Sequence, residues 1–231
     1  MKTIPNKSVD LILIDPPYEI SRPTNFQSGA ETGRDTDRFR ISMDFGEWDK
    51  NFTGLNEVIK EGYRILRDGG TFICFYDLWK ITPLKEMFEK NRYKQIRFIE
   101  WLKTNPVPIN SKINYLTNAR EIAVSAIKIS KPTFNSSYDN GLYQYSICQD
   151  KGRFHPTQKP LAFMEELIKK HSNEGDTVLD CFAGSCTTGL AALNTNRNFI
   201  GCEIDTNYYK QSIDRLKTKL PEDAIITKEE N

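Results

Sequence analysis

Short apolar runs alternate with amphipathic stretches along most of this chain, and that alternation constrains its fold more than any other feature. Residues 9–14 form an apolar run of strand length, and the apolar residues of 55–66 recur at helical spacing. The same reasoning predicts strands at 71–76, 95–102, 121–129, 177–181 and 199–203, and helices at 81–90, directly after Pro160, at 187–194 and at 207–220. Strands that alternate with helices are typical of a doubly wound α/β sheet, which we expect here as a single domain over residues 1–231.

One predicted turn between a strand and a helix has the context of a nucleotide-binding turn. It reads D-C-F-A-G-S-C-T-T-G and begins at Asp180, and the carboxylate of Glu203 follows nineteen residues after Gly184, at the end of the next strand. In doubly wound folds an acidic residue at about that separation binds ribose hydroxyls. The turn has one glycine where a dinucleotide pyrophosphate needs several, so a cofactor without phosphates fits better. An ordinary strand-turn-helix joint is the alternative interpretation.

A second motif, Asp15-Pro16-Pro17-Tyr18, ends the first predicted strand. Prolines cannot continue a sheet ladder, and two in succession hold the backbone stiff. Such a segment can aim a carboxylate and a carbonyl oxygen at one point, and the next aromatic ring can stack on a planar ligand. Two acceptors and a stacking face suit the exocyclic amine of a nucleobase. The alternative is a Pro-Pro strand end followed by a core tyrosine.

Together these motifs resemble those of the beta-type adenine amino-methyltransferases of DNA, which use S-adenosylmethionine. The D-P-P-Y segment comes first, H-P-T-Q-K-P begins at His155, and the turn at Asp180 comes last. That permuted order is similar to the beta-type group, and the resemblance implies a Rossmann-like methyltransferase sheet. Two positions depart from the family pattern D-P-F-x-G-S-G-T-T: in this chain Cys181 replaces the proline and Cys186 replaces the glycine. The second departure places a side chain where the backbone approaches the cofactor or needs a positive φ.

The resemblance also implies site residues. The catalytic segment is Asp15, Pro16, Pro17 and Tyr18: Asp15 and the carbonyl of Pro16 accept hydrogen bonds from the target amine, and Tyr18 stacks on the flipped base. The expected cofactor-binding residues are Asp15, Thr157, Gln158, Lys159, Asp180, Phe182, Ala183, Gly184, Ser185 and Glu203. No metal is expected.

Double-stranded DNA is the partner that the resemblance implies. We expect a target-recognition insertion at about 105–154, with Lys103, Asn105, Lys112 and Arg120 as DNA-binding residues, and a mobile loop at about 19–50. The chain has a net charge of only +1, but residues 92–131 hold eight basic and two acidic side chains, or +6. This segment predicts a local basic face and salt-dependent DNA binding. Asparagines in the insertion are equally explained as turn formers.

Several alternatives stay open from the sequence. A cytosine exocyclic-amine methyltransferase is disfavoured by Asp15, since serine is expected there; a dinucleotide dehydrogenase is disfavoured by the single-glycine turn. The two cysteine departures leave room for a catalytically silent DNA-binding protein. The five scattered cysteines form no C-x-x-C pair, and no apolar run reaches the length of a membrane span, so we expect a cytoplasmic protein. A homodimer and a cognate restriction endonuclease are further partners that the resemblance leaves open.

Overall fold

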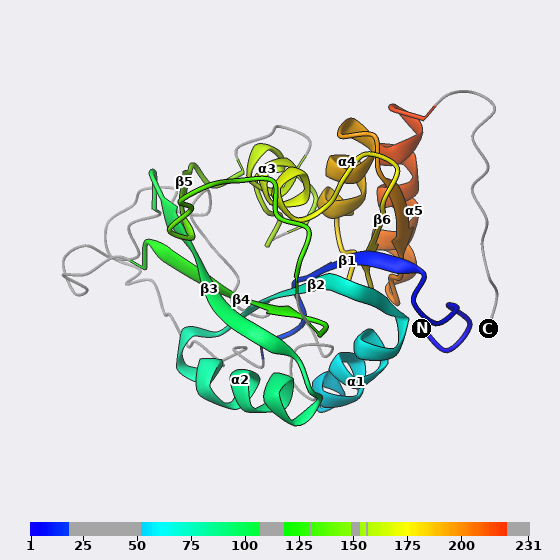
Figure 1. Ribbon diagram of the computed structural model, residues 1–231. Coiled ribbons are helices and arrows are strands. Elements are labelled where there is room, and N and C mark those ends of the chain that lie inside the picture. Colours follow the sequence, from blue (N-terminus) through cyan, green and yellow to red (C-terminus); the bar gives the residue numbers. More distant parts are fainter. Residues whose placement is uncertain (19–51, 107–117, 130, 149–152, 156, 221–231) are drawn as a thin grey trace.

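The computed structural model describes residues 1–18, 52–106, 118–129, 131–148, 153–155 and 157–220. These residues form one seven-stranded sheet with the strand order β5-β3-β4-β2-β1-β6-β7 (Figure 1). The strands are β1 (Val9–Ile14), β2 (Leu66–Tyr76), β3 (Lys94–Lys103), β4 (Arg120–Ile127), β5 (Leu142–Tyr145), β6 (Thr177–Asp180) and β7 (Asn198–Gly201). The helices are α1 (Leu55–Ile65), α2 (Ile81–Lys90), α3 (Leu161–His171), α4 (Thr187–Asn194) and α5 (Thr206–Lys217), with a short 3-10 turn η3 (Leu78–Lys80).

The first strand, β1, lies where the order of the sheet reverses. It pairs in parallel with β2 on one side and with β6 on the other, whereas β4 runs antiparallel to both β2 and β3. Its side chains alternate between the two faces of the sheet: Ile12 and Ile14 pack in one apolar cluster, and Leu11 and Leu13 in another. In open α/β sheets, ligands bind at the carboxyl ends of the strands beside such a switch point. The fold therefore places the residues that follow β1 and β6 at the expected ligand site.

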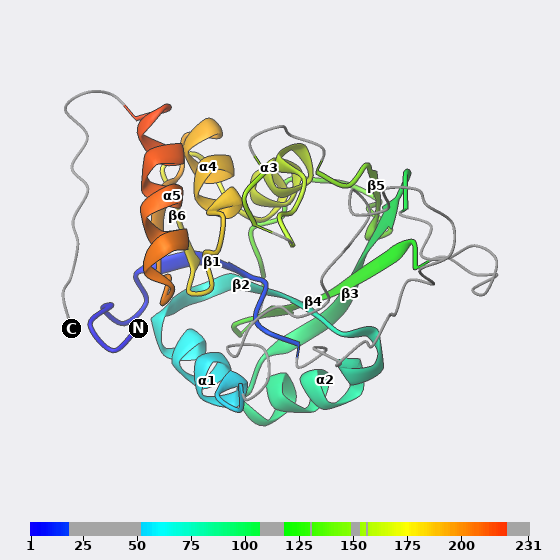
Figure 2. The same ribbon diagram turned by 180° about the vertical axis from the view of Figure 1, so that it is seen from behind.

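Helices cover both faces of the sheet (Figures 1 and 2). On one face, Ile59 of α1 and Phe88 of α2 are fully buried against the aromatic and aliphatic side chains of the strands. On the other, Phe163 of α3 and Ala191 of α4 are equally buried. None of the helices among the described residues has the length and apolar character that a membrane crossing requires.

Most predicted elements are confirmed, and α2 and α4 have the predicted bounds. Two strands differ from the prediction. The predicted irregular segment 130–154 contains the edge strand β5, which pairs in parallel with β3. The strand β2 begins at Leu66 rather than near residue 71, because Gly69 and Gly70 continue the ladder through backbone hydrogen bonds with Lys128. Gly69 has a φ of +81°. The glycine pair that predicts the end of a helix therefore also allows an irregularity within β2.

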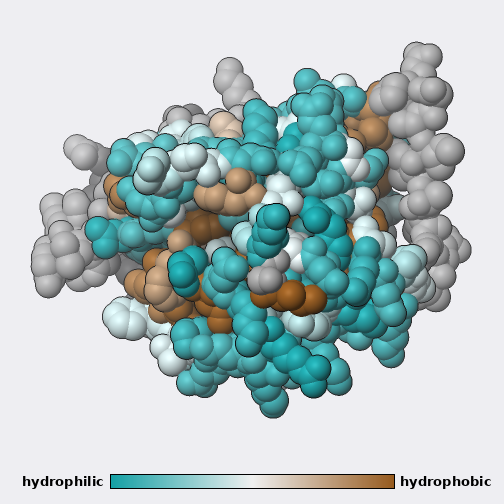
Figure 3. Space-filling model, in the orientation of Figure 1, coloured by the Kyte–Doolittle hydropathy of each residue, from teal (hydrophilic) through white to brown (hydrophobic). Residues whose placement is uncertain are grey.

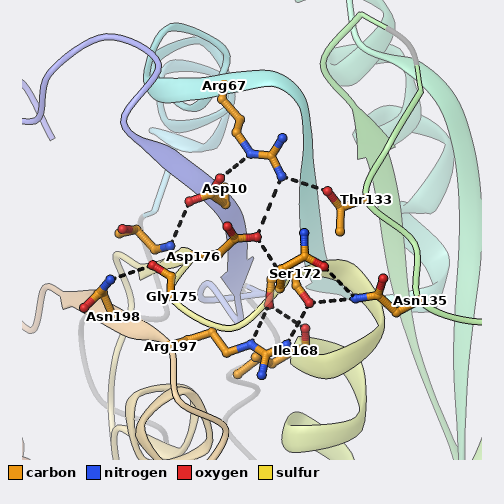
Figure 4. Close-up of polar contacts among 12 residues, drawn as sticks. Asp10, Arg67, Thr133, Asn135, Ile168, Ser172, Gly175, Asp176, Arg197 and Asn198 are labelled. Atoms are coloured by element: carbon orange, nitrogen blue, oxygen red, sulfur yellow. Dashed lines mark hydrogen bonds and ion pairs between the residues drawn. The ribbon is translucent and has the colours of Figure 1, made fainter.

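A polar network fixes the opposite edge of the sheet, at the amino ends of the parallel strands (Figure 4). Arg67 of β2 pairs with Asp10 of β1 and lies 3.7 Å from the carboxylate of Asp176, which precedes β6. Buried Arg197, just before β7, donates to the carbonyl of Ser172 at 2.8 Å. These contacts link the starts of the strands to the end of α3. The predicted motifs lie at the other edge, in the loops that follow the carboxyl ends of the strands.

Candidate active site

The D-P-P-Y segment directly follows the buried strand β1. Ile14 is the last residue of β1 and pairs with Cys74 of β2, so Asp15 emerges at the carboxyl edge of the sheet. Pro16 is buried, and Asp15 and Pro17 are half-buried. The stiff segment thus leaves the sheet at the switch point, as the sequence predicts.

Tyr18 is held against the carboxylate that it follows. Its hydroxyl donates to Oδ1 of Asp15, and its carbonyl accepts a hydrogen bond from Nζ of Lys80 at 2.7 Å. Its ring meets the ring of Tyr76 edge-on, with centroids 5.6 Å apart. Burial and the charge of Asp15 raise the pKa of the Tyr18 hydroxyl well above its ordinary value, so this hydroxyl is a neutral donor.

Lys159 reaches the same carboxylate from the H-P-T-Q-K-P motif. Its ammonium donates to Oδ2 of Asp15, lies 3.1 Å from Glu121 Oε2, and sits 5.0 Å from the centre of the Phe75 ring. Only 7% of the side chain is exposed. Burial alone would lower the pKa of Lys159, but the two carboxylates raise it well above its ordinary value. The lysine is therefore a permanent cation between two anions.

The turn after β6 is organised around a buried carboxylate. Asp180 is 3% exposed, and it accepts hydrogen bonds from the Phe182 amide at 2.9 Å and from the Thr188 hydroxyl at 2.7 Å. Burial raises the pKa of Asp180 to about 7, and the charges of Asp15 and Glu203 act in the same direction. Three carboxylates thus share one region of negative potential at the carboxyl edge.

Gly184 and Glu203 meet as the nineteen-residue spacing predicts. The Gly184 amide donates to Glu203 Oε2 at 2.7 Å, and the Asp205 amide donates to Oε1 at 2.8 Å. Gly184 has a φ of +50°, and a Cβ there would lie 3.3 Å from Nε2 of His155. Beside them, Ile204 is 93% exposed although it is aliphatic. The turn therefore offers close backbone approach, a carboxylate and an apolar surface side by side.

Cys186 takes up the left-handed conformation that a glycine would favour, with φ 56° and ψ 37°. It precedes α4, and its side chain is buried in a small apolar cluster with Leu190. Neighbouring Ser185 is also buried: its hydroxyl lies 3.1 Å from that of Thr187, and its carbonyl accepts from Arg215 at 2.9 Å. Of the two expected roles for this position, the positive φ is confirmed.

The H-P-T-Q-K-P motif joins the other two motifs. The His155 ring packs 4.6 Å from that of Tyr208, and its Nδ1 lies 3.1 Å from the Thr157 hydroxyl. Burial lowers the pKa of His155 to about 4, which keeps the ring neutral near pH 7. Gln158 is buried and donates to Cys148 Sγ at 3.2 Å. Apart from Pro156, which lies outside the described residues, the motif bridges the ends of β1 and β6.

Two of the expected DNA-binding cations are paired with the acidic residues of their own segment. Lys103 Nζ lies 2.8 Å from Glu121, and Arg120 Nε lies 3.1 Å from Glu100. The Arg120 side chain is 67% exposed, whereas that of Lys103 is 16% exposed. Both stand at the carboxyl edge, at the end of β3 and the start of β4.

The remaining expectations for the basic segment divide between two places. Asn105 accepts a hydrogen bond from the Ile147 amide at 2.7 Å through its side-chain oxygen, and Lys112 lies outside the described residues. Lys128, at the far end of β4, is buried and donates to the Leu66 carbonyl at 2.7 Å. The +6 charge of residues 92–131 is therefore spread over both edges of the sheet, and the expectation of one basic face is wrong for Lys128.

Apolar atoms lie among hydrophilic ones near the centre of the face shown in Figure 3. Sequence reasoning missed two residues of the site. Ile204 directly follows Glu203, and its exposure could not be read from the sequence. Glu121 contacts Lys159 only because β4 is inserted between β2 and β3, a pairing that no local pattern signals.

Known proteins share both the sequence pattern and this architecture. The chain matches the N6_N4_Mtase family, described as DNA methylase, over residues 9–214. It is 30% identical over 234 residues to the Type II methyltransferase M2.DpnII of Streptococcus pneumoniae, covering 92% of this chain and 84% of that protein. It is 30% identical over 246 residues to the DNA adenine methyltransferase YhdJ of Escherichia coli (strain K12), covering 94% and 79%.

Two solved structures show the same fold. The crystal structure of the M1.HpyAVI-SAM complex superposes with a TM-score of 0.68 at 30% identity, covering 93% of this chain and 90% of that one. The PvuII DNA methyltransferase (cytosine-N4-specific) superposes with a TM-score of 0.72 at 18% identity, covering 97% and 84%, and shows the fold alone. Because the family match includes the D-P-P-Y segment, the H-P-T-Q-K-P motif and the turn at Asp180, the chain belongs to the N6_N4_Mtase family of DNA methylases.

Proposed function

We propose that this protein transfers a methyl group from S-adenosylmethionine to the exocyclic amine of an adenine that is flipped out of DNA. The observation that carries the proposal is the group of three carboxylates at the switch point. Asp15, Asp180 and Glu203 come from the ends of three neighbouring strands, and the raised pKa of Asp180 reflects burial together with the charges of the other two. A site of this kind favours a cationic ligand.

The residues present fit S-adenosylmethionine better than a dinucleotide. When bound, this cofactor supplies an activated methyl group on a positively charged sulfur. The carboxylates of Asp180 and Glu203 suit that charge and the ribose hydroxyls, and exposed Ile204 offers an apolar surface for a purine ring. A pyrophosphate would meet negative potential here. Lys159, the one buried cation described beside the turn, is already paired with Asp15 and Glu121.

On the substrate side, Asp15 and Pro16 supply the acceptors for the target amine. In this structure each oxygen of the Asp15 carboxylate accepts one hydrogen bond, from Tyr18 or from Lys159. A carboxylate has about four lone-pair positions, so acceptor capacity remains for an amine. The amine lone pair is delocalised into the ring, and acceptors at its hydrogens favour the charge that develops as the methyl group transfers. The carboxylate acts through position and field, without a covalent intermediate.

The Tyr18 ring is the proposed stacking partner of the flipped base. Extrusion of a base costs a few kcal/mol, and stacking on an aromatic ring returns about 1–3 kcal/mol. In this structure the ring packs on Tyr76 and belongs to the surroundings of the apolar cluster under α3. Tyr18 is therefore held beside Asp15 by its hydroxyl and its carbonyl.

Adenine is favoured over cytosine as the target. Asp15 stands where serine is expected for cytosine chemistry, and the relative named as an adenine enzyme is 30% identical to this chain. The cytosine-N4 structure is similar in fold alone. The recognition region would lie in the connection from β3 to β4, which leaves and rejoins the sheet at the carboxyl edge, at Lys103 and Arg120, since β4 itself occupies the middle of the sheet. A homodimer, a cognate restriction endonuclease and a cytoplasmic location belong to the same proposal.

The test is transfer of a labelled methyl group from S-adenosylmethionine to unmethylated double-stranded DNA. We expect incorporation by the wild-type protein and its loss in Asp15→Ala, with cofactor binding by calorimetry weakened but still measurable because Asp180 and Glu203 remain. Glu166→Gln is the matched control, since Glu166 belongs to a separate ion cluster with Lys170 on α3. Equal incorporation by Asp15→Ala would contradict the site assignment, and no incorporation by the wild-type protein on DNA of mixed sequence would contradict the function.

A further inference from the structure

A chain of four alternating charges crosses the carboxyl edge of the sheet beside the target site. It runs from Asp15 after β1, through Lys159, to Glu121 in β4 and Lys103 in β3. The Glu121–Lys159 distance is 3.1 Å and the Glu121–Lys103 distance is 2.8 Å. The side chains are 21%, 7%, 26% and 16% exposed in that order, so solvent screens these charges weakly.

The sheet order explains how these side chains meet. Strand β2 lies between β1 and β4, and fully buried Phe75 of β2 lies beneath the Lys159 ammonium, 5.0 Å from it. Glu121 pairs with Trp101 of β3, one position beyond the end of the β2–β4 ladder. Lys159 thus spans one strand, with an anion on each side.

We propose that Glu121 is a positioning residue: by holding Lys159 from the β4 side, it keeps that lysine from neutralising Asp15 alone. The inference rests on the proposed function and names a residue that neither the motifs nor the family match assigns. Burial alone would raise the pKa of Glu121, but Lys159 and Lys103 lower it, so it is an anion at neutral pH. Glu121 therefore gives Lys159 a second charged partner at neutral pH.

Removing the charge of Glu121 should lower kcat more than it changes cofactor binding. In Glu121→Gln the carboxylate of Asp15 becomes the one anion paired with Lys159, and the local charge rises by one. Charge develops positively on the target nitrogen during methyl transfer, so the transition state is disfavoured more than cofactor binding. We expect kcat to fall roughly tenfold to a hundredfold, less than after loss of a group that touches the reacting atoms. The KM for S-adenosylmethionine should change less than about threefold.

The decisive experiment is a double-mutant cycle with Lys159→Met, read by single-turnover methylation of DNA. If Glu121 acts through Lys159, Glu121→Gln should change the rate little once Lys159 has been replaced by methionine. Glu166→Gln is the matched control, because Glu166 pairs with Lys170 at 2.6 Å in another half-buried ion cluster, and it should leave kcat unchanged. Additive losses in the cycle, or a wild-type kcat in Glu121→Gln, would overturn the inference.

A second readout does not depend on activity. In lysine labelled at Cε and Nζ, nuclear magnetic resonance near pH 7 should show a changed Lys159 Nζ chemical shift and faster exchange of its ammonium protons with water in Glu121→Gln than in wild type, because one of its two anions is gone. An unchanged shift and exchange rate would refute the coupling. If the wild-type protein methylates no DNA, the proposed function fails while this measurement still decides the contact. Should Glu121→Gln not fold, Glu121→Asp keeps the charge one methylene farther away and should give the same changes, smaller in size; no change there would equally refute it.

Discussion

Asp180→Asn should remove a pH-dependent loss of stability that the wild-type protein undergoes between about pH 4 and pH 7. Burial raises the pKa of Asp180 from its ordinary value of 3.8 to about 7. A group whose pKa is raised on folding stabilises fully below its unfolded pKa, and that stabilisation disappears as the pH rises through the folded value. The difference between the unfolded and folded pKa values corresponds to about 4 kcal/mol of folding free energy, at about 1.4 kcal/mol per pH unit.

From pH 5 to pH 8, ionisation of Asp180 should lower the free energy of unfolding of the wild-type protein by about 2 to 3 kcal/mol. Asparagine keeps one oxygen for the amide of Phe182, and the Thr188 hydroxyl can turn to accept from the new amide group. Thermal unfolding at the two pH values should therefore show wild type losing about 5–10 °C relative to Asp180→Asn on going from pH 5 to pH 8. An equal dependence of Tm on pH in both proteins would refute the reasoning.

Cofactor binding gives the same carboxylate a second signature. A cationic ligand beside Asp180 favours its ionised form, so binding near pH 6.5 should release protons. Calorimetry in buffers of different ionisation enthalpy measures that release directly. We expect it in wild type and expect it to vanish in Asp180→Asn, together with weaker cofactor affinity.

Substitutions at three further positions test the site. Gly184→Ala should weaken cofactor binding in calorimetry and lower Tm, because the residue has a φ of +50° and its new Cβ would lie 3.3 Å from the His155 ring; an unchanged dissociation constant would count against close backbone approach. Cys186→Gly should change the free energy of unfolding by no more than about 1 kcal/mol, since relief of the left-handed conformation offsets lost packing, whereas Cys186→Val should destabilise by about 2 kcal/mol or more; equal unfolding temperatures for the two would argue against the strain. Tyr18→Phe should keep kcat/KM for DNA within about tenfold, and Tyr18→Ala should lose about 1–3 kcal/mol of transition-state stabilisation in single-turnover assays; equal effects would exclude stacking.

The sequence was sufficient where a pattern is local. Apolar runs predicted β1 and β6, helical spacing predicted α1 and α3, and the nineteen-residue spacing predicted the meeting of Gly184 with Glu203. These features depend on the alternation of side chains within one element or on a single strand-turn-helix unit. The left-handed conformation at Cys186 was one of the two roles expected there, and a position that usually requires glycine keeps its backbone geometry when another residue occupies it.

Features set by strand pairing were not predictable. The four-residue strand β5 lies at the edge of the sheet within a polar segment, so hydrogen bonds with β3 rather than its own apolar pattern define it. Glu121 was counted only as a charge, since its approach to Lys159 depends on β4 lying next to β2. The same antiparallel strand carries Lys128 to the far edge, which divides a basic segment that is continuous in sequence.

The identity of the methylated base tests the central claim most directly. DNA incubated with the protein and S-adenosylmethionine is digested to nucleosides and analysed by mass spectrometry, with Asp15→Ala and Glu166→Gln treated in parallel. We expect N6-methyladenine from wild type and from Glu166→Gln, and none from Asp15→Ala. N4-methylcytosine, or N6-methyladenine formed equally by Asp15→Ala, would contradict it.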